Sequence, residues 1–326
     1  MKRLVVGVLA HVDSGKTTLS EALLYRAGSI RKLGRVDHRD AFLDTDALEK
    51  ARGITIFAKQ AVLTLPAGTV TGTPLEETQI TLLDTPGHVD FSAEAERTLQ
   101  VLDYAVLVIS GTDGVQSHTE TLWRLLRRYR IPTFVFVNKM DLPGMTREQL
   151  LSQLNHRLGE GFVDFGAEPA ARNEALALCD EQLMEKMLDA GTLTDADIIP
   201  AVARRHVFPC WFGAALRLDG VDALLEGLDR YTRPAPALHA FGARVFKVSQ
   251  DEQGTRLTWL RVTGGELKVK ALLSGEADGE PWAEKANQLR LYSGAKYTLT
   301  EAIGPGQVCA VTGLTHAKPG TGLGAE

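Results

Sequence analysis

The sequence predicts an α/β fold with a mostly parallel sheet, followed by a small β-barrel domain. Short apolar runs alternate with segments of helical period over residues 1–233, which is typical of repeated βαβ units. A proline-containing stretch at 231–236 then ends the helical pattern. From Phe241 onward the segments are short and alternating, with glycine-rich turns. We therefore expect two domains, residues 1–233 and residues 234–326.

The strands are expected where short runs are rich in β-branched and aromatic residues. In the first domain these runs are residues 4–10, 79–84, 104–110, 133–138 and 207–212. Because the carboxyl ends of parallel strands share one edge of a sheet, the loops that leave them should form a ligand-binding crevice. In the second domain we expect strands at 244–248, 256–262 and 307–311, with turns at 263–265 and 304–306.

Residues from about 145 to 205 carry helical signals of their own. Apolar residues between Leu183 and Leu188 lead to Gly191, and Thr194 to Asp197 resembles a capping start. An ordinary crossover between two strands is the alternative, but such a connection usually needs only about a dozen residues or somewhat more. We interpret this stretch as a helical insertion in the first domain.

The composition is that of an ordinary globular protein, with 44% hydrophobic and 24% charged residues. The net charge of -5 gives no global basic field, so any contact with RNA must be local. No apolar run approaches about 18 residues, the length of a membrane span, so we expect a cytoplasmic protein. The cysteines are too far apart for a zinc knuckle and are interpreted as reduced core thiols: Cys179, Cys210 and Cys309.

The segment Ala10–Thr17 follows the first expected strand and opens an expected helix. Backbone N–H groups in such a loop form an anion site, Lys16 can reach the β- and γ-phosphates, and the Thr17 hydroxyl can bind Mg²⁺. Ala10 stands where the first glycine is usual, so we expect no positive φ there. A surface turn is the alternative, but the preceding strand favours a phosphate-binding P-loop. The expected nucleotide contacts are His11, Val12, Asp13, Ser14, Gly15, Lys16, Thr17 and Thr18.

A second motif, residues 84–88, closes the expected strand beside the P-loop. Asp84 can hold Mg²⁺ through a water molecule, and Gly87 offers a backbone N–H to a γ-phosphate. His88 comes next, where a side chain could orient an attacking water; a solvated turn residue is the alternative. Thr55 lies between the two motifs and could close over the γ-phosphate and Mg²⁺. An ordinary strand edge is the alternative for Thr55.

Two further strand ends carry residues that favour guanine. Asn138, Lys139 and Asp141 follow the strand at 133–138. Guanine presents N1–H and N2–H₂ donors that one carboxylate can accept together, whereas adenine lacks this pair. Asp141 therefore favours GTP over ATP, and a plain helix cap is the alternative. After the last strand, a backbone N–H in a short turn can meet the guanine carbonyl oxygen: Gly213, Ala214 and Ala215.

These motifs, in this order, resemble those of the translational GTPases, and within them the elongation factor G branch. The segments that carry the resemblance are residues 10–18, 52–56, 84–88, 138–141 and 213–215, and the second domain is similar to the barrel of those factors. Within the branch, the chain is most similar to the tetracycline-resistance ribosomal protection proteins. The segments that suggest this are residues 21–25, 34–37 and 245–248.

The resemblance implies a P-loop GTP-binding domain whose GTPase is stimulated by the ribosome. In the family, the histidine matching His88 positions the hydrolytic water, the threonine matching Thr55 binds Mg²⁺, and the aspartate matching Asp13 lies close to the phosphates. Ala214 stands where a serine is usual, which leaves the backbone contact intact. The expected catalytic residues are His88, Thr55 and Lys16, and the expected Mg²⁺ ligands are Thr17, Thr55 and Asp84.

The resemblance also implies the cofactors and partners. We expect GTP or GDP with Mg²⁺, and the ribosome as partner, through ribosomal RNA and proteins at the factor-binding site. We expect a monomer, with no DNA and no membrane partner. Members of the branch are much longer and carry further domains that reach the decoding site, so this chain is expected to be a fragment.

Several functions stay open at this stage. One is an enzyme, a ribosome-stimulated GTPase with either a tetracycline-protection or a housekeeping role. Another is a ribosome-binding module in which the nucleotide acts as a conformational switch and unassisted hydrolysis is negligible. An ATP-using P-loop kinase is disfavoured by Asp141.

Overall fold

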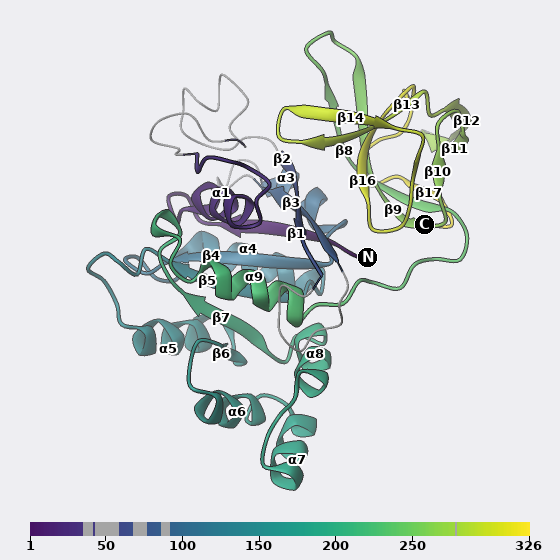
Figure 1. Ribbon diagram of the computed structural model, residues 1–326. Helices are drawn as coiled ribbons and strands as arrows, with labels where there is room; N and C mark the ends of the chain where they lie inside the picture. Colours follow the sequence, from purple (N-terminus) through teal and green to yellow (C-terminus); the bar gives the residue numbers. More distant parts are fainter. Residues whose placement is uncertain (35–41, 43–58, 68–76, 86–91, 278) are drawn as a thin grey trace.

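In the computed structural model, the described residues are 1–34, 42, 59–67, 77–85, 92–277 and 279–326 (Figure 1). Figure 1 shows a sheet flanked by helices, with the β-strands of the second domain beyond one end and a group of helices beyond the other. The two domains therefore differ in architecture as the sequence predicts.

A seven-stranded sheet forms the centre of the first domain, in the order β2-β3-β1-β4-β5-β7-β6. All neighbouring strands are parallel except β2 with β3. The five expected strands are confirmed, and β2 and β6 add to them at the two edges. The bounds are β1 Lys2–Ala10, β2 Lys59–Leu65, β3 Thr78–Asp84, β4 Tyr104–Ser110, β5 Thr133–Asn138, β6 Phe162–Asp164 and β7 Phe208–Phe212.

Helices cover both faces of this sheet, which is why its central strands are apolar. On one face, α1 and α9 bury Leu23 and Leu228 in a common core. On the other face, α4 and α5 bury Leu126 and Leu154. No helix within the described residues is long and apolar enough to span a membrane. The bounds are α1 Lys16–Arg26, α3 Ser92–Leu99, α4 Ser117–Arg128, α5 Arg147–Leu158 and α9 Val221–Arg230.

The predicted insertion contains α5 and three further helices, α6 Pro169–Ala177, α7 Glu181–Ala190 and α8 Asp195–Ala203. The two helix signals are confirmed. Gly191 ends α7 with φ 69°, and Thr194 forms a capping box with Asp197 at the start of α8. The insertion is not purely helical, because β6 pairs with β7 and extends the sheet. Its expected bounds, about 145–205, stay a prediction.

The second domain is an antiparallel β domain with its own core. Its main sheet has six strands in the order β14-β13-β16-β9-β8-β17. Both expected turns contain a glycine with positive φ, Gly265 at 59° and Gly306 at 79°. The bounds are β8 Gly242–Gln250, β9 Arg256–Gly264, β10 Leu267–Lys268, β11 Leu272–Ala277, β12 Glu280–Lys285, β13 Gln288–Ser293, β14 Lys296–Thr300, β15 Ala302–Ile303, β16 Val308–Thr312 and β17 Gly322–Gly324.

The β domain packs directly on the first domain. The buried Arg261 of β9 donates from Nη2 to Asp103 Oδ1 at 2.6 Å and from Nη1 to the Val101 carbonyl oxygen at 2.9 Å. The second carboxylate oxygen of Asp103 accepts a hydrogen bond from the Val5 N–H at 2.8 Å. The expected domain boundary at 233–234 lies between α9 and β8 and stays a prediction.

The three cysteines are free thiols, as the sequence predicts. Cys210 and Cys309 are buried, and Cys179 is half-buried. Burial raises the pKa of Cys179 to about 11, so this thiol stays protonated at neutral pH. None of the three therefore has the thiolate character of a reactive cysteine.

Glu284 of β12 is expected to stabilise the β domain in a pH-dependent way. Burial alone would raise its pKa, but hydrogen bonds from Thr315 and His316 lower the pKa from 4.5 to about 2. Folding therefore favours the ionised carboxylate. The contribution of Glu284 to the stability of the folded state is complete above the unfolded pKa of 4.5 and is lost as pH falls from 4.5 to about 2. We expect Glu284→Gln to lower the melting temperature at neutral pH and to approach wild type in acid. Equal melting temperatures at neutral pH would contradict this assignment.

Candidate functional site

The P-loop leads from the end of β1 into α1, at the carboxyl edge of the sheet. Ala10 remains in β1 without a positive φ, as expected, and the left-handed conformation falls instead on Asp13 at 62°. The Ser14 N–H donates to the His11 carbonyl oxygen at 3.2 Å and closes the turn. Because the first N–H groups of a helix lack intrahelical acceptors, the first turn of α1 presents donors to this loop. The residues of this turn are Lys16, Thr17 and Thr18.

Lys16 and Asp84 form an ion pair inside the crevice. Their side chains are 8% and 1% exposed. Asp84 is the last residue of β3 and lies in register with Val8 of β1, which brings it beside the start of α1. Its second oxygen, Oδ2, is buried and accepts no hydrogen bond from the described residues. The fold thus brings together residues from two separate motifs.

Asn138 joins the phosphate loop to the turn at 213–215. Its Nδ2 donates to the Ser14 carbonyl oxygen at 3.0 Å, and its Oδ1 accepts from the Ala215 N–H at 2.9 Å. Gly15 lies against this amide with φ 86°, and a Cβ there would lie 2.2 Å from Asn138 Nδ2. Only glycine fits this position. One buried side chain therefore fixes two of the predicted loops relative to each other.

Asp141 lies near the mouth of the crevice with a side chain that is 20% exposed. Lys139 adopts φ 64°, and the Met140 N–H donates to the Gly213 carbonyl oxygen at 3.0 Å, which holds this loop against the turn at 213–215. Arg217 Nε pairs with Asp141 Oδ2 at 2.8 Å. Sequence patterns did not single out Arg217, although it is the first cation after that turn.

The N–H groups of the turn already have acceptors within the protein. The Ala214 N–H donates to the Asp219 carbonyl oxygen at 3.1 Å, and the Ala215 N–H donates to Asn138. A contact between Ala215 and a base carbonyl would require that hydrogen bond to be shared or exchanged. The predicted contact of this turn with guanine stays a prediction.

A polar cluster at the end of β4 was also missed by sequence reasoning. The hydroxyls of Ser110 and Thr112 donate to Asp113 and hold its pKa below the ordinary value. The buried ring of His118, on α4, lies 6.0 Å from the ring of His11 in the P-loop. The sequence signal available for His118 was its place in the first turn of the helix that follows β4. His118 thus gives the P-loop a neighbour from α4.

Three expected site residues lie outside the described residues, namely Thr55, Gly87 and His88. Their predicted roles on the γ-phosphate, the Mg²⁺ ion and the attacking water stay predictions. Among the described P-loop residues, Val12, Thr17 and Thr18 are half-buried and Asp13 is exposed. The described part of the site therefore contains the residues at the ends of β1, β3, β5 and β7 that are predicted to bind phosphate, metal or base.

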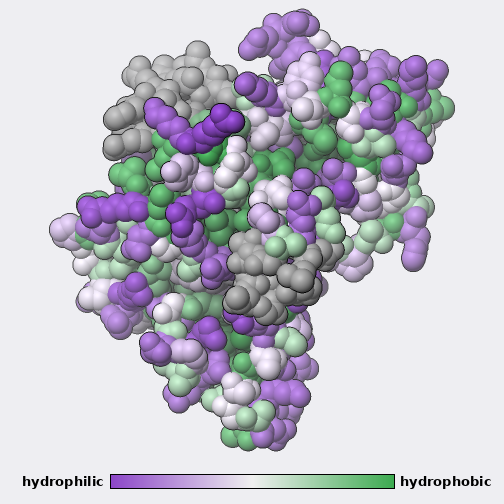
Figure 2. Space-filling view, in the orientation of Figure 1, coloured by the Kyte–Doolittle hydropathy of each residue, from purple (hydrophilic) through white to green (hydrophobic). Residues whose placement is uncertain are grey.

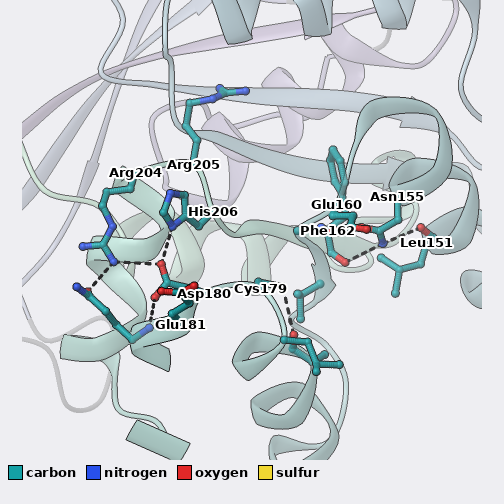
Figure 3. A pocket seen from close by; sticks show the side chains of 15 residues that line it. Leu151, Asn155, Glu160, Phe162, Cys179, Asp180, Glu181, Arg204, Arg205 and His206 are labelled. Carbon is teal, nitrogen blue, oxygen red and sulfur yellow. Dashed lines mark hydrogen bonds and ion pairs between the residues drawn. The ribbon is translucent and has the colours of Figure 1, made fainter. Parts of the chain in front are cut away.

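A cavity of about 1030 Å³ lies in the insertion, away from this crevice (Figure 3). On one side of it, Asp180 accepts hydrogen bonds from His206 at 2.6 Å and Arg204 at 3.2 Å. These polar groups therefore satisfy one another. None of the predicted site residues lines this cavity.

The insertion also has exposed leucines, Leu178 and Leu188. Apolar residues reach the surface where α7 forms the lower tip of the molecule (Figure 2).

The fold and the crevice together define a P-loop nucleotide-binding protein. Residues 1–234 match the model of the family described as the elongation factor Tu GTP binding domain, and the chain belongs to this family. Guanine-nucleotide binding is thereby supported. Within the translational GTPases, its relatives place it in the elongation factor G branch.

The relatives include two resistance proteins and one elongation factor. The oxytetracycline resistance protein of Streptomyces rimosus is 38% identical over 83% of this chain and 43% of its own length. The tetracycline resistance protein TetM of Streptomyces lividans is 35% identical over 99% of this chain and 53% of its own. Elongation factor G of Amoebophilus asiaticus is 29% identical over 98% of this chain and 56% of its own. The chain thus spans about half the length of these relatives.

A solved structure supports the fold across both domains. A protein of Thermus thermophilus superposes with a TM-score of 0.81 at 27% identity, over 99% of this chain and 54% of that protein. The match extends beyond residue 234, so the β domain is part of the shared architecture.

Proposed function

We propose that this chain binds GTP and GDP with Mg²⁺ and hydrolyses GTP when it is stimulated by the ribosome. The observation that carries the proposal is the Asn138 side chain, which joins the P-loop to the turn at 213–215 and so sets Lys16 and Asp141 on one framework. Lys16 supplies the positive charge for phosphates, and Asp141 supplies the acceptors for guanine. A cation for phosphates and a carboxylate for a base at the carboxyl ends of strands of one sheet are the groups that a guanine nucleotide requires.

The residues that the structure describes fit a Mg²⁺ ion. Asp84 Oδ2 is buried and accepts no hydrogen bond from the described residues, and Thr17 offers a hydroxyl oxygen one residue after Lys16. Oxygen ligands of this kind suit Mg²⁺, which usually keeps several waters and binds through one or two protein groups and substrate phosphates. The bound ion would neutralise charge on the phosphates. With nucleotide and ion bound, Lys16 would contact the phosphates, and Asp84 would help to hold the ion.

Of the two roles considered, tetracycline protection of the ribosome is favoured over a housekeeping role in translation. The two resistance proteins are 38% and 35% identical to this chain, whereas the elongation factor is 29% identical. We therefore propose a cytoplasmic, monomeric factor of the tetracycline-protection kind, with the ribosome as partner. Growth of a tetracycline-sensitive strain that expresses the full-length gene, measured at graded drug, tests this choice. Unchanged susceptibility would favour the housekeeping role.

Two measurements test the activity. Calorimetric titration with GTP, GDP and ATP in Mg²⁺ should show binding of the two guanine nucleotides and none of ATP. Single-turnover GTP hydrolysis should be slow for the protein alone, on the order of 10⁻⁴ s⁻¹ as in small GTPases without an arginine finger, and faster with ribosomes. Comparable affinities for ATP and GTP would refute the base assignment. Hydrolysis that ribosomes leave unchanged would favour the switch module.

His88→Ala is expected to separate binding from hydrolysis. A group that orients water acts mainly in the transition state, so its loss should leave the GTP dissociation constant nearly unchanged and slow ribosome-stimulated hydrolysis by at least about a hundredfold. His118→Ala, in the polar cluster beside the P-loop, serves as the comparison for a histidine that has no proposed contact with water. Wild-type hydrolysis by His88→Ala on ribosomes would rule out the role.

A further inference from the structure

We propose that Gln60 is a positioning residue through which the β domain sets nucleotide affinity in the first domain; this inference rests on the proposed function. Gln60 lies on β2, the antiparallel edge strand of the sheet, opposite Leu83 of β3. The neighbouring pair in the same register is Lys59 with Asp84. Gln60 is therefore one residue pair away from the carboxylate that pairs with Lys16.

The side chain of Gln60 reaches into the β domain. It is 6% exposed, and its Nε2 donates to the Tyr292 carbonyl oxygen at 3.1 Å and to the Val308 carbonyl oxygen at 3.4 Å. The two carbonyls belong to β13 and β16, so one amide ties β2 to two strands of the other domain. Removal of a buried donor leaves its acceptors unsatisfied, which makes such a contact costly to lose.

The outer edge of β2 is covered by the turn between β13 and β14, residues 293–296. The Gly294 N–H donates to the Gln60 carbonyl oxygen at 2.8 Å, and the Ser293 hydroxyl accepts from the Val62 N–H at 3.2 Å. Residues 60 and 62 present these groups on the same side of the strand, where a further strand would pair. The β domain therefore satisfies two outward-facing backbone groups of β2.

Glycine is required at the tip of this turn. Gly294 has φ 61°, and a Cβ there would lie 2.6 Å from a ring carbon of Phe42. The Phe42 side chain packs in turn against the core that contains α1. The turn thus contacts the first domain at two places, β2 and Phe42. β2 pairs with the strand that carries Asp84, and Phe42 packs against the core to which α1 contributes.

Another described contact between the domains, made by Arg261, lies elsewhere. Arg261 binds Asp103, which directly precedes β4, at the amino ends of the parallel strands. The P-loop and Asp84 lie at the carboxyl ends of those strands. Loosening the Arg261 contact should therefore lower stability while the pairing of β2 with β3 is kept. A variant at Arg261 therefore distinguishes an effect of the β2 contact on nucleotide binding from a general loosening of the contact between the domains.

The experiment measures the release of a fluorescent GDP analogue from the whole chain, in Mg²⁺ and in EDTA. Gln60→Leu keeps the approximate size of the side chain and removes the donor; it should release GDP about tenfold faster in Mg²⁺. Ser293→Ala removes only the Val62 acceptor and should give about a threefold increase, which Ser293→Thr restores. In EDTA all variants should release GDP at the wild-type rate, because Asp84 acts through the metal.

Arg261→Lys is the control, since it keeps the charge but loses the guanidinium geometry. It should lower the melting temperature and release GDP like wild type in Mg²⁺. If both Gln60→Leu and Ser293→Ala released GDP at the wild-type rate, the inference would be overturned while the proposed function would stand. The same conclusion would follow if Arg261→Lys accelerated GDP release equally, or if the acceleration persisted in EDTA. If wild type binds no GDP, the proposed function fails first, and the inference falls with it. Ser293→Ala keeps the test decisive if Gln60→Leu does not fold.

Discussion

Asp141→Asn is expected to change the base preference from guanine to xanthine. The carboxylate accepts from N1–H and N2–H₂ of guanine together, and charge-assisted hydrogen bonds of this kind are worth about 1.5–3 kcal/mol each. An amide at this position keeps one acceptor but presents a donor, which suits the carbonyl oxygen at the 2-position of xanthine. We expect GTP affinity to fall by about a hundredfold or more and XTP affinity to rise.

Calorimetric titration of Asp141→Asn with GTP, XTP and ATP tests this expectation. Asp219→Asn is the matched control: Asp219 is exposed beside the same turn, and its backbone carbonyl, which the substitution keeps, accepts the Ala214 hydrogen bond. It removes the same charge and should leave the GTP affinity at the wild-type value. Arg217→Ala should change the affinity little, because an exposed ion pair contributes only about 0–1 kcal/mol. Unchanged GTP binding by Asp141→Asn would contradict the base assignment.

Lys16→Ala is expected to abolish measurable GTP and GDP binding. The ammonium group is the only cation of the described P-loop segment 10–18, and without it several phosphate charges would enter a crevice that still contains Asp84. The loss of charge-assisted contacts should raise the GTP dissociation constant by at least about a hundredfold. Fluorescence titration with a labelled nucleotide measures this change. Binding within a few fold of wild type would refute the role of Lys16.

The same substitution leaves the carboxylate of Asp84 buried without its partner, so it should also lower the melting temperature of the nucleotide-free protein. The double variant Lys16→Met with Asp84→Asn removes both charges. It should regain stability without regaining nucleotide binding. This outcome would distinguish the loss of a ligand contact from the loss of the fold.

The central strands could be predicted from sequence because they are buried on both faces and therefore read as unbroken apolar runs. All residues of β4 and β5 are buried, and the polar ones stand at the strand ends. β2 was missed because it is an edge strand with three half-buried residues among its seven, so it does not form an unbroken buried run. β6 was missed because it has only three residues.

The candidate site was predictable where its residues are contiguous, as in the P-loop and the motif at 138–141. The contacts between these segments were not predictable, because they depend on which strand ends become neighbours. The nucleotide contact of Asn138 stays a prediction, whereas the hydrogen bonds of its side chain with the Ser14 carbonyl oxygen and the Ala215 N–H were not foreseen. The pairing of Arg217 with Asp141 and the approach of His118 to His11 likewise arise only in the folded chain.

The covered edge of β2 has a consequence for self-association. An edge strand with free N–H and C=O groups is a template for pairing with another chain. Here the Gly294 N–H and the Ser293 hydroxyl occupy groups of Gln60 and Val62 that a second molecule would otherwise use. Displacement of the β domain would therefore leave these two groups of β2 without their partners, close to Asp84. We expect variants that weaken this domain contact to self-associate more readily than the wild type.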